Sequence, residues 1–221
     1  MGKVLGVLGG MGPAATVAFM ERVVALTPAA GDEDHIRMLV DLNPQVPNRH
    51  SDPDGARRVL GGMAARLRDM GAEVLAMPCN TAHAHAEAIR AAGLPFLDMI
   101  AATVQAAAAT GARRIGVLAT PGGERLYKAA LAARGAEPVV LEGADREAFM
   151  ALVYGVKRGE VGAGARAGMA RLAEALSRAG AEALIAGCTE VPLLLDAEAA
   201  PLPLTDSAEV LAQACVEACK G

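Results

Sequence analysis

The stretch Asp69-Met-Gly-Ala-Glu-Val-Leu-Ala-Met-Pro-Cys79 has a second version 109 residues further along the chain. There the sequence reads Arg178-Ala-Gly-Ala-Glu-Ala-Leu-Ile-Ala-Gly-Cys188, and Gly, Ala, Glu, Leu and Cys fall at equal positions. A second match pairs Gly6-Val-Leu8 with Gly116-Val-Leu118 at an offset of 110. Two separate matches at nearly one offset predict duplicated halves of roughly 100 residues each, which is the size of a small domain.

Short apolar runs alternate with longer Ala-rich segments that suit helices. The pattern predicts strands at residues 4–8, 38–42, 74–77, 115–119, 138–141 and 183–186. It predicts helices at residues 16–26, 55–70, 81–92 and 207–220, with others between the later strands. This alternation is typical of an α/β fold, here two pseudo-symmetric three-layer lobes with mostly parallel sheets. The expected lobes are residues 1–98 plus 207–221 and residues 99–206. We expect them to face each other, each with a cysteine just after a strand end, where ligands collect in parallel sheets.

Composition excludes several classes of protein. The 221 residues are 53% hydrophobic and 2% aromatic with a formal net charge of -4, so neither a basic surface nor stacking platforms favour nucleic acid or an anionic membrane. The uncharged stretch between Lys3 and Glu21 is broken by glycines and Pro13, which argues against a spanning helix and a signal peptide. Four cysteines are too few for a disulfide scaffold, so we expect a cytoplasmic protein with free thiols.

Two of the four cysteines are candidates for chemistry. Cys79 lies in Met77-Pro-Cys-Asn-Thr-Ala-His83, where free backbone N–H groups and the positive end of the expected helix favour a thiolate. Asn80 and Thr81 add polar groups there. Cys188, in Gly187-Cys-Thr-Glu-Val-Pro192, has the same strand-end setting and a neighbouring carboxylate, Glu190. Each cysteine alone could be a small buried hydrophobe, but their pairing by the repeat predicts a functional role.

The remaining thiols and the histidines are weaker candidates. Cys215 and Cys219 lie four residues apart on the expected terminal helix, and no second pair completes a metal site, so we expect packing residues. His83 either tunes Cys79 from one turn away, or caps the helix and contacts solvent. The other histidines are expected at the surface: His35, His50 and His85.

Three further segments could hold a ligand. Gly9-Gly-Met-Gly-Pro-Ala-Ala-Thr16 matches neither the dinucleotide fingerprint nor the P-loop, so it is either a tight turn or a backbone cradle for a small carboxylate. Arg49 lies in a loop with two prolines and suits bidentate binding of a carboxylate. Lys157 is a second candidate cation. Lone basic residues in loops are mostly solvated surface, so the residues alone favour that role for both side chains.

These segments together resemble the aspartate/glutamate racemase family. The resemblance is carried by the glycine-rich turn, by Pro78-Cys-Asn-Thr-Ala-His83 and by Gly187-Cys-Thr-Glu-Val-Pro-Leu-Leu194, and it runs from Val4 to the last helix. Glutamate racemases usually have Asp-Ser-Gly in the first turn and His after the second Cys-Thr. This chain has Gly9-Gly10-Met11 and Glu190 there, so it is more similar to the aspartate racemase branch.

The resemblance implies two pseudo-symmetric lobes with the active site in the cleft between them. It also implies a homodimer that needs neither pyridoxal phosphate nor a metal. It implies that Cys79 and Cys188 flank the substrate Cα, one removing the α-proton as thiolate and the other delivering a proton as thiol. Arg49 would clamp the side-chain carboxylate, while the Asn80, Thr81 and Thr189 amides and hydroxyls would hold the α-carboxylate. The substrate-binding residues carried over from the family are Met11, Arg49, Asn80, Thr81, Thr120, Lys157, Thr189 and Glu190.

Two departures leave the substrate open. Ala84 stands where many relatives have an aromatic residue, and Pro121-Gly122-Gly123 stands where they continue Gly-Thr. Both changes fall at the expected rim of the cleft. We therefore expect a racemase of aspartate, with glutamate or homoserine as other possible substrates. The alternatives are a dicarboxylate isomerase or decarboxylase of the wider superfamily, and a non-catalytic binder of a small carboxylate or nucleotide.

Overall fold

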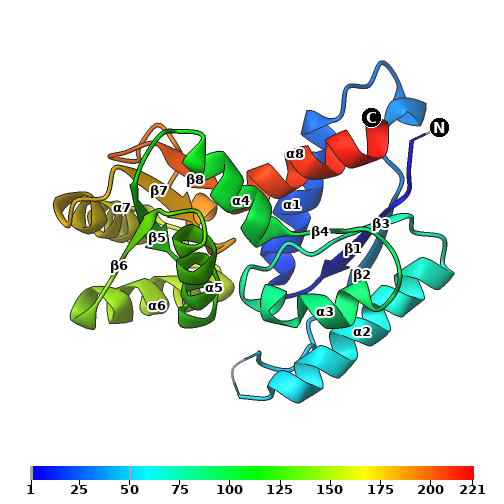
Figure 1. The fold of residues 1–221 in the computed structure, drawn as a ribbon, viewed down its shortest axis with the longest axis horizontal. Coiled ribbons are helices and arrows are strands. Elements are labelled where there is room, and N and C mark those ends of the chain that lie inside the picture. Colours follow the sequence, from blue (N-terminus) through cyan, green and yellow to red (C-terminus); the bar gives the residue numbers. More distant parts are fainter. Residues whose placement is uncertain (1, 50) are drawn as a thin grey trace. The chain divides into compact units, whose positions relative to one another are not determined.

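The computed structural model describes residues 2–49 and 51–221, and the chain divides into two compact units (Figure 1). Unit 1 comprises Met1–Ala102 and Ala208–Gly221, and unit 2 comprises Thr103–Ser207. Each unit contains a four-stranded sheet in which every pairing is parallel. The predicted α/β fold with two like lobes and parallel sheets is confirmed.

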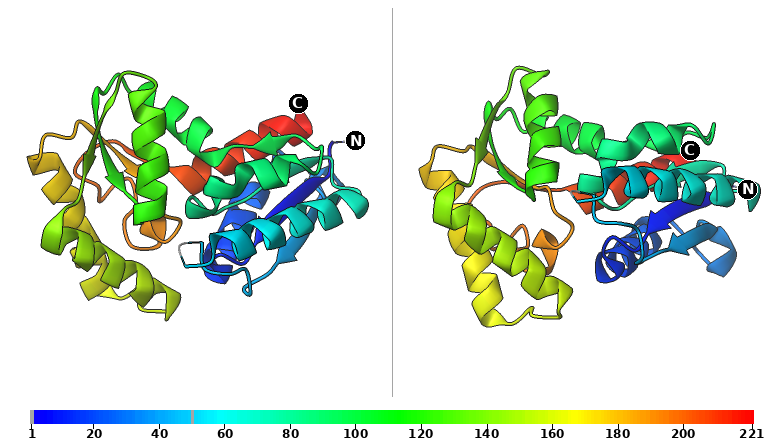
Figure 2. Two further views of the ribbon diagram at one scale, coloured as in Figure 1. Left: turned by 60° about the horizontal axis from the view of Figure 1, so that its bottom comes forward. Right: turned by 90° about the horizontal axis from the view of Figure 1, so that it is seen from below.

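The sheet of unit 1 has the strand order β2-β1-β3-β4 and is covered by helices on both faces (Figure 2). Alternate residues of β1 point to opposite faces, as expected for a strand. Leu5 and Val7 pack with α1 and α8, whereas Leu8 packs with α2 and α3. The strands and helices of this unit are β1 (Leu5–Gly9), β2 (Met38–Leu42), β3 (Val74–Ala76), β4 (Phe96–Leu97), α1 (Pro13–Leu26), α2 (Pro53–Asp69), α3 (Ala86–Arg90) and α8 (Ser207–Lys220).

The sheet of unit 2 repeats this arrangement in the order β6-β5-β7-β8. Its largest core cluster joins Leu118 and Leu184 of the sheet to Phe149 and Leu172 of two covering helices. Helix α4 carries the chain across the boundary between the units. The elements are α4 (Met99–Ala108), β5 (Arg114–Leu118), α5 (Pro121–Ala132), β6 (Glu137–Val140), α6 (Gly143–Lys157), α7 (Ala163–Arg178), β7 (Ala183–Ala186) and β8 (Leu204–Asp206).

Two strands and one helix differ from the sequence prediction. Strands β4 and β8 were not predicted because they have only two and three residues, too few to show a strand period. Both are edge strands that are only partly buried, so they lack the fully buried apolar run that marks the equally short β3. The predicted helix over residues 81–92 is instead a 3₁₀ turn at Thr81–His85 followed by the short helix α3.

The residues shared by the two repeats have matching structural roles. Glu73 Oε2 accepts the N–H of Val4 at 2.8 Å, and Glu182 Oε2 accepts the N–H of Arg113 at 2.6 Å, so each carboxylate caps the start of a first strand. These backbone donors hold the pKa of the Glu182 carboxyl below its usual value. Gly71 and Gly180 both have positive φ angles, +99° and +89°, which favour glycine.

Gly6 in β1 and Gly116 in β5 also have corresponding surroundings in the two units. A Cβ on Gly6 would lie 2.8 Å from Leu75 Cδ2, and one on Gly116 would lie 2.6 Å from Leu184 Cδ2. Ala72 and Ala181 are the next neighbours in the two cases. Since both members of each contact recur in the repeat, the close approach of the neighbouring strand and of the loop before it explains why these positions are shared.

We expect Gly116→Ala to lower the free energy of unfolding by about 1–3 kcal/mol, because the added methyl group overpacks the contact with Leu184. Urea denaturation measures the change. Gly164→Ala on α7 is the control, because a Cβ there meets nothing within 4 Å, and helix propensity predicts no loss or a small gain. An unchanged urea midpoint for Gly116→Ala would contradict the packing argument.

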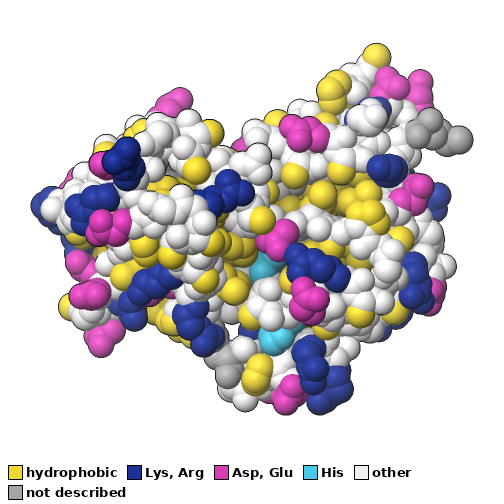
Figure 3. All heavy atoms as spheres, viewed as in Figure 1, with side chains coloured by type: hydrophobic (Ala, Val, Ile, Leu, Met, Phe, Trp, Pro, Cys, Tyr) yellow, Lys and Arg dark blue, Asp and Glu magenta, His cyan; other side chains and the backbone are white. Residues whose placement is uncertain are grey.

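Charged side chains of both signs are interspersed on the face of the molecule in Figure 3. This face carries no uniform basic surface, as the net charge of -4 predicts. Among the helices built from residues 2–49 and 51–221, none has the length and apolar character needed to span a bilayer.

Candidate active site

Cys79 lies in a short loop after strand β3. The strand ends at Ala76, the Cys79 N–H donates to Met77 O at 2.8 Å, and Asn80 precedes the 3₁₀ turn. The thiol is buried in a core cluster that also contains Met63 and Met77. The predicted long helix after Cys79 is wrong, because the chain forms a single 3₁₀ turn there. A helix dipole sums over aligned peptides, so this turn offers less positive potential than predicted.

His83 holds the Cys79 loop in place through two hydrogen bonds of its ring. Its Nε2 accepts the N–H of Met99 at 3.1 Å, so Nδ1 carries the proton and donates to Cys79 O at 2.9 Å. The buried ring also stacks on Phe96, with centroids 5.3 Å apart. His83 therefore contacts the Cys79 backbone rather than capping a helix or facing solvent. It ties the cysteine loop to the first residue of α4.

Burial lowers the pKa of His83, so the folded protein holds a neutral imidazole. The unfolded chain binds a proton more readily, and folding stability should therefore fall as the pH drops below the unfolded value of about 6.5. We expect His83→Gln to be less stable than the parent protein at pH 7.5 but to lose less stability between pH 7.5 and 5. Melting temperatures across this range measure both effects. His35→Gln, which removes an exposed imidazole, should retain the parent's profile.

Cys188 lies directly after strand β7 in unit 2. The Gly187 N–H donates to Leu118 O at 3.0 Å, and a Cβ on Gly187 would lie 2.6 Å from Tyr127 Cε2. Tyr127 is buried beneath this turn, and burial raises its pKa, while Thr103 and Ser207 hydrogen-bond its hydroxyl. The turn before Cys188 therefore requires glycine because an aromatic ring fills the space below it.

Glu190 contacts the thiol of Cys188, and Thr189 and Lys157 contact Glu190 in turn. Its Sγ donates to Glu190 Oε2 at 2.8 Å, and Thr189 Oγ1 donates to the same oxygen at 3.3 Å. Lys157 Nζ on α6 lies 3.7 Å from Glu190 Oε1. Cys188 shares the strand-end setting that the sequence predicts to favour a thiolate at Cys79, but its own surroundings favour the thiol. Burial raises the pKa of the thiol well above its usual value, Glu190 adds to the rise, and Lys157 only partly opposes it.

The other predicted site residues fall into two groups. In unit 2, Thr120 caps the N-terminus of α5 and accepts the Gly123 N–H at 3.4 Å. In unit 1, Asn80 is buried and Thr81 is half-buried beside Cys79, while the Met11 side chain packs in the same core cluster as Cys79. Asn80 and Thr81 thus lie in the same unit as Cys79, and Thr120 lies in the same unit as Cys188, while the buried side chain of Met11 leaves its backbone for a ligand.

Arg49 has an unexpected neighbour in His85. The Arg49 Nε and His85 Nε2 atoms are both buried, and neither has a hydrogen-bond partner within the described part of the chain. Burial lowers the pKa of His85, and the positive charge of Arg49 lowers it further. His85 was expected at the surface, but it is half-buried. No sequence signal marks it, because the closeness of Arg49 and His85 depends on the tertiary structure rather than on adjacent residues.

The remaining expectations on cysteines and histidines have mixed outcomes. His35 is exposed as predicted, whereas His50 lies outside the described residues. Cys215 and Cys219 pack in the core with α1 and β1, which confirms their role as packing residues. Within residues 2–49 and 51–221, no three His, Cys, Asp or Glu side chains come together in a way that could hold a metal ion.

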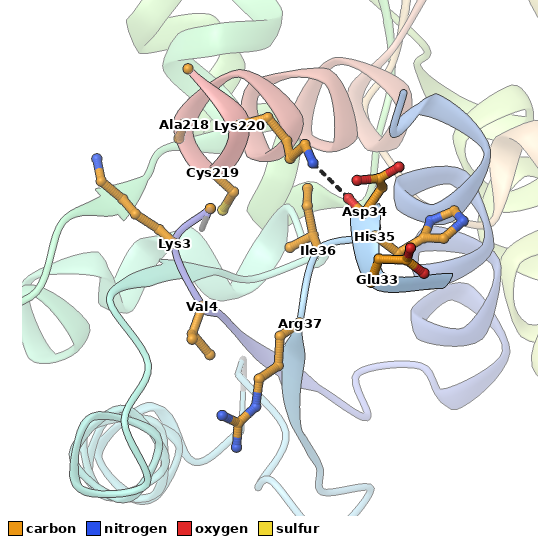
Figure 4. A pocket seen from close by; sticks show the side chains of 12 residues that line it. Lys3, Val4, Glu33, Asp34, His35, Ile36, Arg37, Ala218, Cys219 and Lys220 are labelled. Atoms are coloured by element: carbon orange, nitrogen blue, oxygen red, sulfur yellow. Dashed lines mark hydrogen bonds between the residues drawn. The ribbon is translucent and has the colours of Figure 1, made fainter. Parts of the chain in front are cut away.

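A pocket of about 700 Å³ lies at the chain ends of unit 1, away from the predicted site residues (Figure 4). It is lined by side chains of both charge signs, and Lys220 Nζ donates to Asp34 O at 2.6 Å across it. Lys3 and Val4 precede β1, so this pocket is at the amino ends of the parallel strands. Cys79 follows the carboxyl end of β3, which is where ligands bind in such sheets.

The fold and these sites define an α/β protein of two like units, each with a buried cysteine after the third strand of its sheet. A family model for Asp/Glu/hydantoin racemases matches residues 8–215. The chain belongs to this family, and the resemblance predicted from its motifs is confirmed. It is therefore a racemase-family protein of the class that acts on amino acids.

Named relatives agree with this assignment. The broad specificity amino-acid racemase RacX of Bacillus subtilis is 27% identical over 220 residues, which cover 96% of each chain. A glutamate racemase of Synechococcus is 34% identical over 157 residues, covering 68% of this chain and 56% of the relative. The solved structure of Picrophilus torridus aspartate racemase has a TM-score of 0.88 at 27% identity, covering 98% of this chain and 94% of that one.

Proposed function

We propose that the protein is a cofactor-independent racemase of acidic amino acids, with aspartate as its main substrate and Cys79 and Cys188 as its two bases. The observation that best supports this proposal is the repeat of residues 69–79 and 178–188, which ends in a cysteine in both copies. The fold accounts for the other positions shared by residues 69–79 and 178–188. The shared glycine has a positive φ angle, the shared alanine and leucine pack against a glycine of the first strand, and the shared glutamate caps the start of that strand. The cysteine pair is the shared pair that carries reactive chemistry.

The proposed reaction needs two cysteines in opposite protonation states. A thiolate removes the proton from Cα and becomes a thiol, and the other thiol gives its proton to the opposite face and becomes a thiolate. The carbon inverts, and no atom is gained or lost. The raised pKa of Cys188 supports its role as the initial thiol. Cys79 would then act first as the thiolate, and the roles would reverse in the opposite direction.

The carbanion that forms between the two transfers needs stabilisation by hydrogen-bond donors. Asn80, Thr81 and Thr189 lie next to the two cysteines in sequence and would bind the α-carboxylate, where fixed donors are most effective in a site that excludes water. Arg49 would bind the side-chain carboxylate. Its buried Nε lacks a partner among the described residues, which costs free energy unless a ligand supplies an acceptor.

The choice of aspartate is supported by the aspartate racemase of Picrophilus torridus, and a wider substrate range is supported by RacX. Thr120 and the Met11 backbone remain proposed contacts of the substrate. The homodimer and the cytoplasmic location remain predictions from the family resemblance.

A panel of L-amino acids in heavy water tests the proposal. Without added cofactor, aspartate should lose its Cα proton signal in NMR spectra and become racemic by chiral chromatography. Maleate and a nucleotide belong in the same panel. Turnover of maleate without exchange in aspartate would indicate the isomerase alternative. Ligand-dependent melting without any deuterium at Cα would indicate a non-catalytic binder, and either result would overturn the proposed function.

A further inference from the structure

The carboxylate of Glu190 already has a protein partner on each oxygen. Oε2 accepts hydrogen bonds from Cys188 Sγ at 2.8 Å and Thr189 Oγ1 at 3.3 Å, and Oε1 lies 3.7 Å from Lys157 Nζ. The side chain is 6% exposed. A buried carboxylate that is paired in this way has little capacity left for a substrate, and it would repel the carboxylates of an acidic amino acid.

We propose that Glu190 is a positioning residue that keeps the proton on Cys188, and that Lys157 limits this effect by binding the other carboxylate oxygen. The physical basis is the direct contact. A thiol donates to the carboxylate, whereas a thiolate would lie next to a like charge. The role replaces the substrate-binding role that the family resemblance implied for Glu190. Its importance in turnover rests on the proposed function, but the protonation state of Cys188 can be measured without turnover.

This arrangement makes the two cysteines unequal. In the resting enzyme Cys188 is the acid, which leaves Cys79 as the base. After one turnover the proton is on Cys79 and Cys188 is a thiolate beside Glu190. Release of the Cys79 proton to solvent and uptake of one proton by Cys188 restore the resting form. Because the two enantiomers have equal free energy in solution, Glu190 cannot favour one of them in kcat/KM, and its effect falls on kcat and KM separately.

The groups packed against Cys188 make opposite contributions. Glu190 and Lys157 carry opposite charges: Glu190 raises the pKa of the Cys188 thiol, and Lys157 lowers it. Tyr127 on α5 also faces this region, but its hydroxyl is engaged by Thr103 and Ser207, and its raised pKa keeps it neutral. The pair Glu190 and Lys157 therefore offers a test by sign rather than by magnitude alone.

The test is an NMR titration of protein labelled with ¹³C at the cysteine Cβ, with the Cys188 signal assigned from Cys188→Ser. In the parent protein Cys188 should remain a thiol up to at least about pH 9. In Glu190→Gln its titration should begin about one pH unit lower or more, and in Lys157→Gln it should begin higher. Glu160→Gln is the matched control, since Glu160 is an exposed carboxylate paired with Arg158.

Each outcome decides the inference. A Cys188 thiolate at pH 7 in the parent protein, no shift in Glu190→Gln, or shifts of the same sign in both variants would overturn it. If Glu190 only supported the turn, either substitution would loosen the turn, and the pKa of Cys188 would shift in the same direction in both variants. If Glu190→Gln fails to fold by circular dichroism, Glu190→Asp and Lys157→Gln provide the same comparison. If the protein does not racemise aspartate, the pKa shifts of Cys188 in these variants are still expected. Failure of the proposed function and failure of this inference are therefore distinguishable.

Discussion

Cys79→Ala and Cys188→Ala should each abolish racemisation of aspartate, with kcat/KM lower by about 10²–10⁴-fold. The reason is chemical: inversion needs a base on one face of Cα and an acid on the other, and one sulfur cannot supply both. Each variant removes one of these groups. Chiral chromatography of the products from each enantiomer measures the loss in both directions.

A residual activity would identify the surviving base. Cys188→Ala keeps Cys79 as a base and should still exchange the α-proton of one enantiomer with heavy water. Cys79→Ala keeps only the thiol of Cys188 and should exchange the opposite enantiomer much more slowly. Cys215→Ala is the control, because this cysteine packs in the core of unit 1 and should affect stability rather than turnover. Substantial racemisation in both directions by either catalytic variant would overturn the two-base mechanism.

Arg49→Leu should lower kcat/KM for aspartate by roughly 10²-fold, since charge-assisted hydrogen bonds to a carboxylate are among the strongest in proteins. The substitution removes the positive charge and the partner-free Nε but keeps apolar carbon atoms out to Cδ. An amino acid without a second carboxylate, such as homoserine, should lose much less. The ratio of kcat/KM for the two substrates measures the specificity carried by Arg49.

Arg57→Leu is the matched control for Arg49→Leu. Arg57 pairs with Asp54 on the surface of α2, with 61% of its side chain exposed, and its charge also acts on His85. It should leave the substrate ratio unchanged. Equal losses for aspartate and homoserine in Arg49→Leu would show that Arg49 supports the fold of its loop rather than binding the side-chain carboxylate.

Much of the architecture could be predicted because it depends on local patterns. Strands Met38–Leu42 and Ala183–Ala186 have the predicted bounds, since each is an apolar run that ends at a polar or glycine residue. The duplicated Glu73 and Glu182 indicate two like units from the sequence alone, and in the structure each caps the start of a strand. The edge strands β4 and β8 could not be predicted, because their pairing depends on neighbours rather than on their own few residues.

The candidate site divides in the same way. Its two cysteines, their placement after β3 and β7, and the family itself follow from motifs in the amino-acid sequence, because strand ends and turn chemistry are encoded by adjacent residues. The tertiary structure decided the contact of Cys188 with Glu190, the anchoring of the Cys79 loop by His83, and the closeness of Arg49 to His85. Hydrogen bonds and pKa values depend on burial and on charges brought in by distant segments, such as Lys157 beside Glu190.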